Sequence, residues 1–167
     1  MSAASAPVVA IIGCGNPTRS DDGVGPDIVR CLAAGSLGRM APAVRLYDAG
    51  TDGLAVLFAA RGCGLLILVD ACRSGAAPGA VFEVPARELD ALPQPVLGTH
   101  ELRWNHALAA GRSIFGADFP AETTVFLIEA ETLAFGIELS GPVAAAAELV
   151  AARIEAFVLA RLALTSP

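Results

Sequence analysis

Lysine is absent from this chain of 167 residues, and charged side chains of either sign are scarce. All 11 basic residues are arginines scattered singly along the sequence, against 17 acidic residues, so the formal net charge is −6 at pH 7. Binding to a phosphate backbone requires basic side chains that displace counterions, and anionic membrane surfaces attract the same kind of cluster. The composition therefore argues against nucleic-acid binding and against docking on a membrane surface.

Long hydrophobic runs are also missing, although 54% of the residues are apolar and the mean hydropathy is +0.61. A membrane-spanning helix needs roughly 20 consecutive apolar residues, whereas a run such as residues 65–69 ends directly in Asp70. An apolar-rich chain with 17% charged residues is not intrinsically disordered. Residues 1–7 have neither the charged nor the hydrophobic region of a signal peptide. We therefore expect one domain over residues 1–167, soluble, cytoplasmic and monomeric.

Several common functional motifs are lacking as well. The four cysteines include no C-x-x-C pair and no zinc-ribbon spacing, which favours reduced thiols. There is no H-E-x-x-H helix of a zinc peptidase and no G-x-S-x-G nucleophile elbow. Cys14 precedes no obvious helix start, so a cysteine nucleophile has no support in the sequence.

Short apolar runs alternate with segments of helical periodicity. We predict strands at residues 8–12, 44–47, 65–69, 81–84 and 124–128, and helices at residues 24–34, 54–60, 101–115 and 143–164. The last helix carries one apolar stripe at helical spacing, made of Val143, Ala147, Val150, Ile154, Phe157 and Val158. This order predicts an α/β fold, a three-layer sandwich in which a mostly parallel, twisted sheet has helices on both faces.

A glycine-rich loop follows the first predicted strand. Gly13 and Gly15 suggest the dinucleotide motif G-x-G-x-x-G, but Thr18 stands where its third glycine would be. Asp21 and Asp22 then precede the first predicted helix, where carboxylates would repel a pyrophosphate. A nucleotide-binding α/β enzyme is therefore a weaker alternative.

Carboxylates and a histidine fall at one edge of the predicted sheet. Ligands of open α/β sheets bind beyond the carboxyl ends of the strands, and Asp70 directly follows the third predicted strand. One of Asp21 and Asp22, with Asp70 and His100, would form an open site for a divalent transition metal. Each aspartate also has a structural explanation, as a helix cap or a turn cap. The other histidine, His106, shares no helix face with His100, and we expect it at the surface or in packing.

The ordered set of motifs resembles the hydrogenase maturation proteases. The strongest match is to the signature G-x-G-N-x4-D-[DE]-G-x-G, which this chain fulfils from Gly13 to Gly25. The other matching pieces are Asp48-Ala49-Gly50-Thr51 with Gly53-Leu54, Val69-Asp70-Ala71, Pro78-Gly79, Thr99-His100-Glu101, and Gly136 with Leu139-Ser140 and Val143. The resemblance covers nearly the whole chain.

The resemblance implies an endopeptidase that removes a short C-terminal extension from the large-subunit precursor of a nickel–iron hydrogenase. Family members bind nickel through an acidic residue, an aspartate and a histidine, which correspond here to Asp22, Asp70 and His100. The resemblance thus makes these three residues the expected metal-binding and catalytic residues, and nickel carried by the precursor the recognition element. An incomplete shell of this kind leaves positions for ligands from the substrate.

How the peptide bond would break stays open at this point. A metal-polarised carbonyl, a metal-bound water and a carboxylate acting as general base are all compatible with the residues. The candidates for contact with the substrate are loop residues Gly13, Gly15, Asn16 and Asp21, although Asn16 would serve equally well in an Asx-turn that holds the loop.

The chain departs from the family pattern around the end of its last predicted strand. The family often has Gly-[Ile/Val]-[Glu/Gln]-Pro there, whereas this chain has Leu127-Ile128-Glu129-Ala130. We expect a differently shaped turn and a distinct hydrogenase partner. A non-catalytic, metal-dependent binding module with the same pocket is the second alternative to the protease.

Overall fold

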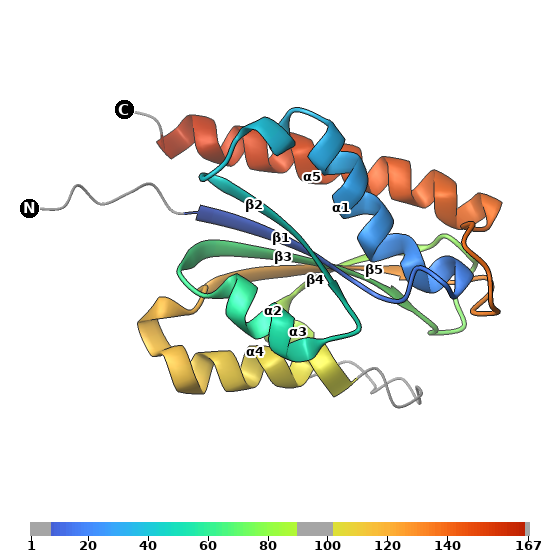
Figure 1. Ribbon diagram of the computed structural model, residues 1–167, viewed down its shortest axis with the longest axis horizontal. Coiled ribbons are helices and arrows are strands. Elements are labelled where there is room, and N and C mark those ends of the chain that lie inside the picture. The colour runs from blue at the N-terminus through green and yellow to red at the C-terminus, as the bar shows by residue number, and fades with distance from the viewer. Residues whose placement is uncertain (1–7, 90–101, 166–167) are drawn as a thin grey trace, which may run out of the picture.

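The computed structural model describes residues 8–89 and 102–165 (Figure 1). Its strands are β1 (Val8–Cys14), β2 (Val44–Gly50), β3 (Cys63–Cys72), β4 (Val81–Pro85) and β5 (Glu122–Glu129). Its α-helices are α1 (Val24–Ala34), α2 (Gly53–Ala60), α3 (Ala86–Leu89), α4 (Leu102–Phe115) and α5 (Gly141–Thr165). Short 3-10 turns are η1 (Ser20–Gly23), η2 (Leu37–Arg39) and η3 (Gly116–Asp118). The strands and helices predicted from the sequence are all present, with bounds that differ by a few residues.

The strands form one sheet in the order β2-β1-β3-β5-β4. β1 pairs in parallel with β2 and β3, and β3 pairs in parallel with β5, whereas β4 runs antiparallel to β5. The predicted α/β fold with a mostly parallel sheet is therefore confirmed. The chain goes outward from β1 to β2 and then returns past β1 to β3. The strand order thus reverses between β1 and β3, which is where open α/β sheets bind ligands.

Helices cover both faces of the sheet, so the molecule has three layers. α1 and α5 lie on one face, and α2 and α4 lie on the other (Figure 1). β3 divides its side chains between them: Leu65, Ile67 and Val69 pack toward α1 and α5, while Leu66 and Leu68 pack toward α2 and α4. Because side chains alternate along a strand, a buried central strand must be apolar at consecutive positions. This explains the apolar run that the sequence shows there.

Helix α5 buries most of its predicted apolar stripe. Val143, Val150, Ile154 and Val158 are fully buried against the sheet, but Phe157 is 43% exposed. Phe157 is thus the one member of the stripe that is largely exposed, at one margin of the arc that the stripe occupies on the helix. Neither α5 nor any other helix within residues 8–89 and 102–165 combines the length and hydrophobicity needed to cross a membrane.

Candidate functional site

The candidate site lies at the carboxyl ends of β1 and β3, where the strand order reverses. Gly13 of β1 pairs with Val69 of β3, so the residues that follow these two positions lie side by side at the same edge of the sheet. Asp70 lies within the last part of β3 rather than after it, because the strand continues to Cys72 and pairs with β5. The predicted convergence of the loop after β1 with Asp70 is therefore present.

Gly15 is the point at which the two aspartate-bearing segments meet. Its φ of +130° is a backbone conformation that glycine adopts without strain. A Cβ atom at Gly15 would lie 1.8 Å from the Asp22 carbonyl oxygen and 3.7 Å from Asp70 Oδ1. Only a residue without a side chain fits between these two segments. Gly15 thus lets the backbone of Asp22 approach the side chain of Asp70.

Asp22 and Asn16 hold the loop between β1 and η1. The backbone N–H of Asn16 donates a hydrogen bond to Asp22 Oδ2 at 3.0 Å. The Asn16 Oδ1 atom accepts hydrogen bonds from the Thr18 backbone N–H at 2.9 Å and from the Thr18 hydroxyl at 2.7 Å. This is the Asx-turn that the sequence left as one of two roles for Asn16. Contact between Asn16 and a substrate stays a prediction.

Asp21 is wholly buried and points into the protein rather than toward a substrate. Its Oδ2 accepts hydrogen bonds from the backbone N–H groups of Glu131 and Thr132, at 2.8 and 3.0 Å, and from the Ser140 hydroxyl at 2.9 Å. Its Oδ1 accepts from the Ser140 backbone N–H at 2.7 Å. The expectation that Asp21 meets substrate is corrected: its carboxylate anchors the loop between β5 and α5.

The same hydrogen bonds set the ionisation of Asp21. Burial acts to raise its pKa, but the hydrogen bonds from Thr132, Ser140 and Glu131 outweigh burial, and the pKa lies below its ordinary value. Of the two neighbouring aspartates, Asp22 is therefore the one left half-buried in the loop at the candidate site.

Asp70 is held from two sides. Its Oδ1 accepts a hydrogen bond from the Ala71 backbone N–H at 2.8 Å. Its Oδ2 accepts one from the indole Nε1–H of Trp104, in the first turn of α4, at 2.9 Å. Sequence reasoning missed Trp104. Two features of the sequence could have indicated it: Trp104 is the one tryptophan of the chain, and it lies in the helix predicted directly after Thr99-His100.

The last residue of β5, Glu129, is a second buried carboxylate that sequence reasoning did not single out as structural. Glu129 accepts hydrogen bonds from the Ser74 backbone N–H at 2.8 Å, from the Ser74 hydroxyl at 2.7 Å and from the Gly75 backbone N–H at 3.1 Å. Burial acts to raise the pKa of Glu129, but these hydrogen bonds outweigh it and the pKa is lowered. Glu129, at the end of β5 and within the segment that departs from the family pattern, therefore anchors the turn that follows β3.

Close helix–strand packing explains the other glycines of the loop signature. A Cβ atom at Gly13 would lie 2.3 Å from the Gly25 carbonyl oxygen. A Cβ atom at Gly25 would lie 2.3 Å from the carbonyl oxygen of Cys14 and 2.5 Å from that of Val69. These glycines let the start of α1 touch the ends of β1 and β3. Their presence is thus explained without a bound pyrophosphate.

The thiol of Cys14 lies beside the site but is poorly suited to attack a peptide bond. Burial, and to a smaller extent the nearby carboxylates of Asp70 and Asp48, raise the pKa of Cys14 well above its ordinary value. The thiol is therefore protonated at neutral pH, and a thiolate is the form that acts as a nucleophile. Among the described residues at this site, the carboxylates are therefore the groups able to take up a proton or bind a cation.

The third expected ligand, His100, falls outside the described residues, as does the motif Thr99-His100-Glu101. Among residues 8–89 and 102–165, no group of three or more His, Cys, Asp or Glu side chains is placed to hold a metal ion. Within this part of the chain, the candidate site therefore rests on Asp22 and Asp70.

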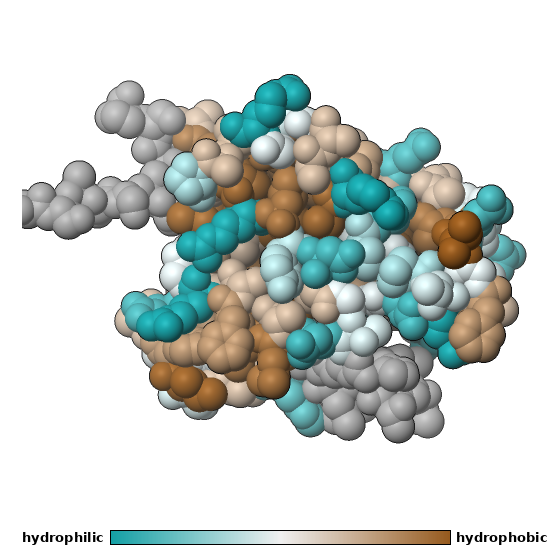
Figure 2. All heavy atoms as spheres, in the orientation of Figure 1, coloured by the Kyte–Doolittle hydropathy of each residue, from teal (hydrophilic) through white to brown (hydrophobic). Residues whose placement is uncertain are grey.

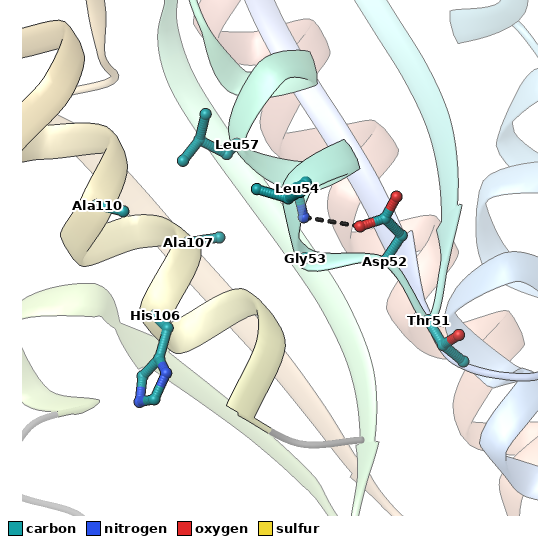
Figure 3. Close-up of a pocket in the computed structure, with 8 residues that line it drawn as sticks. All are labelled: Thr51, Asp52, Gly53, Leu54, Leu57, His106, Ala107 and Ala110. Carbon is teal, nitrogen blue, oxygen red and sulfur yellow. Dashed lines mark hydrogen bonds between the residues drawn. The ribbon is translucent and has the colours of Figure 1, made fainter. Parts of the chain in front are cut away.

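His106 lies elsewhere, beside a cavity of about 550 Å³ between α2 and α4 (Figure 3). Figure 3 shows its ring projecting away from α2 and from Asp52, which caps α2 by accepting from the Leu54 N–H at 2.9 Å. A larger groove of about 1020 Å³ follows β2 and α2, where Figure 2 shows apolar side chains at the surface. Asp22 and Asp70 line neither hollow. The exposed position of His106 agrees with the predicted surface role.

Comparison with known proteins relates the chain to hydrogenase maturation. A family model described as hydrogenase maturation protease matches residues 29–156. The hydrogenase expression/formation protein HupM of Azotobacter chroococcum mcd 1 is 31% identical over 166 residues, which cover 98% of this chain and 77% of HupM. HoxM of Azotobacter vinelandii is 31% identical over 147 residues, which cover 86% of this chain and 69% of HoxM.

Solved structures agree with this relationship. The hydrogenase maturating endopeptidase HybD from E. coli superposes with a TM-score of 0.79 at 26% identity, over 92% of this chain and 93% of HybD. The hydrogenase 2 maturation peptidase from Thaumarchaeota archaeon SCGC_AB-539-E09 has a TM-score of 0.66 at 27% identity, over 90% of this chain and 97% of that protein. With its sequence motifs, its sheet order and these matches in agreement, the chain belongs to the hydrogenase maturation protease family.

Proposed function

We propose that this protein is an endopeptidase that removes the C-terminal extension from the large-subunit precursor of a nickel–iron hydrogenase. The observation that carries the proposal is the approach of the Asp22 backbone to the Asp70 carboxylate at Gly15, at the reversal of strand order, in a chain of this family. Carboxylates at this position are able to bind a cation and to accept a proton, and both actions assist peptide hydrolysis.

Nickel belongs to the substrate in this proposal. Asp22 and Asp70, with His100 as the third ligand expected from sequence, would contact nickel that the precursor already holds. Two carboxylates and one imidazole make an incomplete shell of borderline and hard donors, which leaves room for ligands of the precursor and competes weakly with its thiolates. This donor set suits a site that checks for nickel without removing it.

The residues support two routes for the cleavage step. In one, nickel held by the precursor polarises the scissile carbonyl. In the other, a carboxylate of Asp22 or Asp70 acts as general base toward the attacking water. Both routes place the same two aspartates next to the reacting bond. Attack by Cys14 is not among them, because its raised pKa keeps the thiol protonated.

The direct test uses purified protein with the precursor in nickel-loaded and nickel-free form. Loss of the C-terminal extension is followed by mass spectrometry of the intact precursor. We expect cleavage of the loaded form and none of the nickel-free form. An intact loaded precursor after prolonged incubation would contradict the protease, and cleavage of both forms alike would contradict nickel as the recognition element.

The same experiment distinguishes the protease from the alternative hypothesis, a non-catalytic metal-dependent binding module. That module would form a stable complex with the loaded precursor and leave its length unchanged. The expectations of a monomer and of a cytoplasmic location stay predictions, which sedimentation of the purified protein and cell fractionation would check.

A further inference from the structure

The hydrogen bond between Trp104 and Asp70 connects helix α4 to strand β3 at the candidate site. Trp104 is a buried residue of α4, packed in the apolar cluster between the sheet and the helices α2 and α4. Its Nε1–H donates to Asp70 Oδ2 at 2.9 Å. Because side chains alternate along β3, Asp70 lies on the same face as Leu66 and Leu68, which is the face that α4 covers.

The two oxygens of Asp70 face different surroundings. Oδ2 is bonded to the indole, whereas Oδ1 lies on the side of Gly15, where a Cβ atom would be 3.7 Å away. The Ala71 N–H at 2.8 Å holds Oδ1 as well. Because Oδ1 accepts from the adjacent N–H of its own strand and Oδ2 accepts from α4, the carboxylate has little freedom to rotate. The indole therefore fixes which oxygen is turned toward the loop of Asp22.

We propose that Trp104 is the positioning residue of this site: its indole N–H fixes the Asp70 carboxylate so that Oδ1 faces the Asp22 loop. The inference rests on the proposed function and extends it to a residue of α4. A purely apolar role would not require a nitrogen, because phenylalanine fills most of the same volume. A buried indole N–H needs an acceptor, and here the acceptor is the carboxylate expected to meet the substrate.

Residues that hold a metal-binding carboxylate in place commonly contribute 10- to 100-fold to affinity or activity. We therefore expect Trp104→Phe to lower kcat for the nickel-loaded precursor by about 10- to 100-fold. KM should change little, since the substitution leaves the surface of the protein as it is. The fold of Trp104→Phe is checked by circular dichroism and thermal unfolding.

Leu108→Ala is the matched control for packing. Leu108 is buried one turn further along α4, in the same apolar cluster, and its side chain carries no donor. This substitution should lower the unfolding temperature while leaving kcat near that of the wild type. If Trp104→Phe and Leu108→Ala lower kcat in the same proportion to their loss of stability, Trp104 is only a packing residue.

A spectroscopic readout tests the contact without precursor or nickel. Trp104 is the one tryptophan of the chain, so indole emission reports on this position alone. Asp70→Ala removes the acceptor from the indole N–H, and we expect the emission maximum to shift to longer wavelength as water takes its place. Asp22→Ala removes a neighbouring carboxylate that does not bond the indole, and its emission should match that of the wild type.

The activity measurement and the emission measurement test different claims. An unchanged emission in Asp70→Ala, or a Trp104→Phe protein with the kcat of the wild type, would overturn the positioning role. A wild-type protein that fails to cleave the loaded precursor would overturn the proposed function instead, and the emission arm would still decide whether Trp104 holds Asp70.

Discussion

Asp21 and Asp22 are neighbours in the sequence, yet their carboxylates serve different parts of the molecule. Asp21 is buried and accepts four hydrogen bonds from the loop between β5 and α5. Asp22 stays half-buried and accepts from the N–H of Asn16 in its own loop. At the residue scale, one aspartate therefore anchors a distant loop, and the other lies half-buried at the candidate site, where its action stays a prediction.

The first prediction concerns the site carboxylates. Asp22→Ala and Asp70→Ala should each lower processing of the nickel-loaded precursor by more than about 100-fold, because each removes a group expected to contact the substrate directly. His100→Ala should do the same. His106→Ala is the control, since this exposed side chain lines a different cavity, and its processing rate should match that of the wild type. Normal cleavage by any of the first three variants would remove that residue from the site.

The second prediction concerns Asp21 as an anchor. Asp21→Asn replaces two accepting oxygens by one oxygen and one donor, so backbone N–H groups of the loop lose their acceptor. We expect a loss of about 3 kcal/mol in the free energy of unfolding, measured by urea denaturation. The same change at Asp27, whose carboxylate forms an exposed ion pair with Arg30 at 2.7 Å, should cost less than about 0.5 kcal/mol. Equal effects of the two substitutions would show that Asp21 is not an anchor.

At the scale of elements, the start of α1 lies unusually close to the strands beneath it. Carbonyl oxygens of β1 and β3 stand 2.3 and 2.5 Å from where a Cβ atom of Gly25 would be. These are backbone atoms of two central strands, which cannot shift without disturbing the sheet. The glycine spacing of the loop signature is therefore explained by the contact between one helix and two strands.

The third prediction tests this close contact. Gly25→Ala should lower the free energy of unfolding by about 3 kcal/mol or more, because the added methyl group meets backbone atoms that have no room to yield. Gly141→Ala, at the start of α5, is the matched control. Nothing lies within 4 Å of a Cβ atom there, so alanine should be neutral or stabilise by up to about 1 kcal/mol. Similar unfolding midpoints for the two variants would contradict the packing argument.

At the scale of the whole molecule, two buried carboxylates join segments that are distant in the sequence, one from the turn η1 and one from the end of β5. Asp21 holds the segment before α5, and Glu129 holds the turn after β3. Hydrogen bonds lower the pKa of both groups below their ordinary values. A lowered folded-state pKa means that the unfolded chain binds protons more readily, so acid must destabilise the fold through these groups.

The fourth prediction is the resulting pH dependence. The contribution of Asp21 and Glu129 to stability is fully present above their unfolded pKa values of about 4. It is lost as the pH falls through their lower folded-state values. Urea denaturation between pH 7 and pH 3 should show this loss in the wild type. The double variant Asp21→Asn with Glu129→Gln should be less stable at pH 7 and depend less on pH over this range. Parallel curves for the two proteins would contradict the assignment.

The order of strands and helices could be predicted from the sequence because each element carries its own local pattern. Consecutive apolar residues identify buried parallel strands such as β3, and helical spacing identifies α1 and α5. The predicted order, together with the rule that ligands bind at the carboxyl ends of strands, also indicated that the loop of Asp22 and Asp70 would lie at one edge of the sheet. These conclusions depend on short stretches of chain and on general topology.

The division of roles between the aspartates required the tertiary structure. The hydrogen bonds of Asp21 join residues 110 to 119 positions apart, and that between Trp104 and Asp70 joins residues 34 apart. No local pattern records such contacts, because they exist only after the sheet has formed and α4 has packed on it. The sequence by itself therefore determined the fold class and the edge of the sheet that carries the candidate site. Only the tertiary structure decided that Asp21 is a buried anchor and that Asp70 is held by Trp104, since burial and hydrogen bonding depend on distant neighbours.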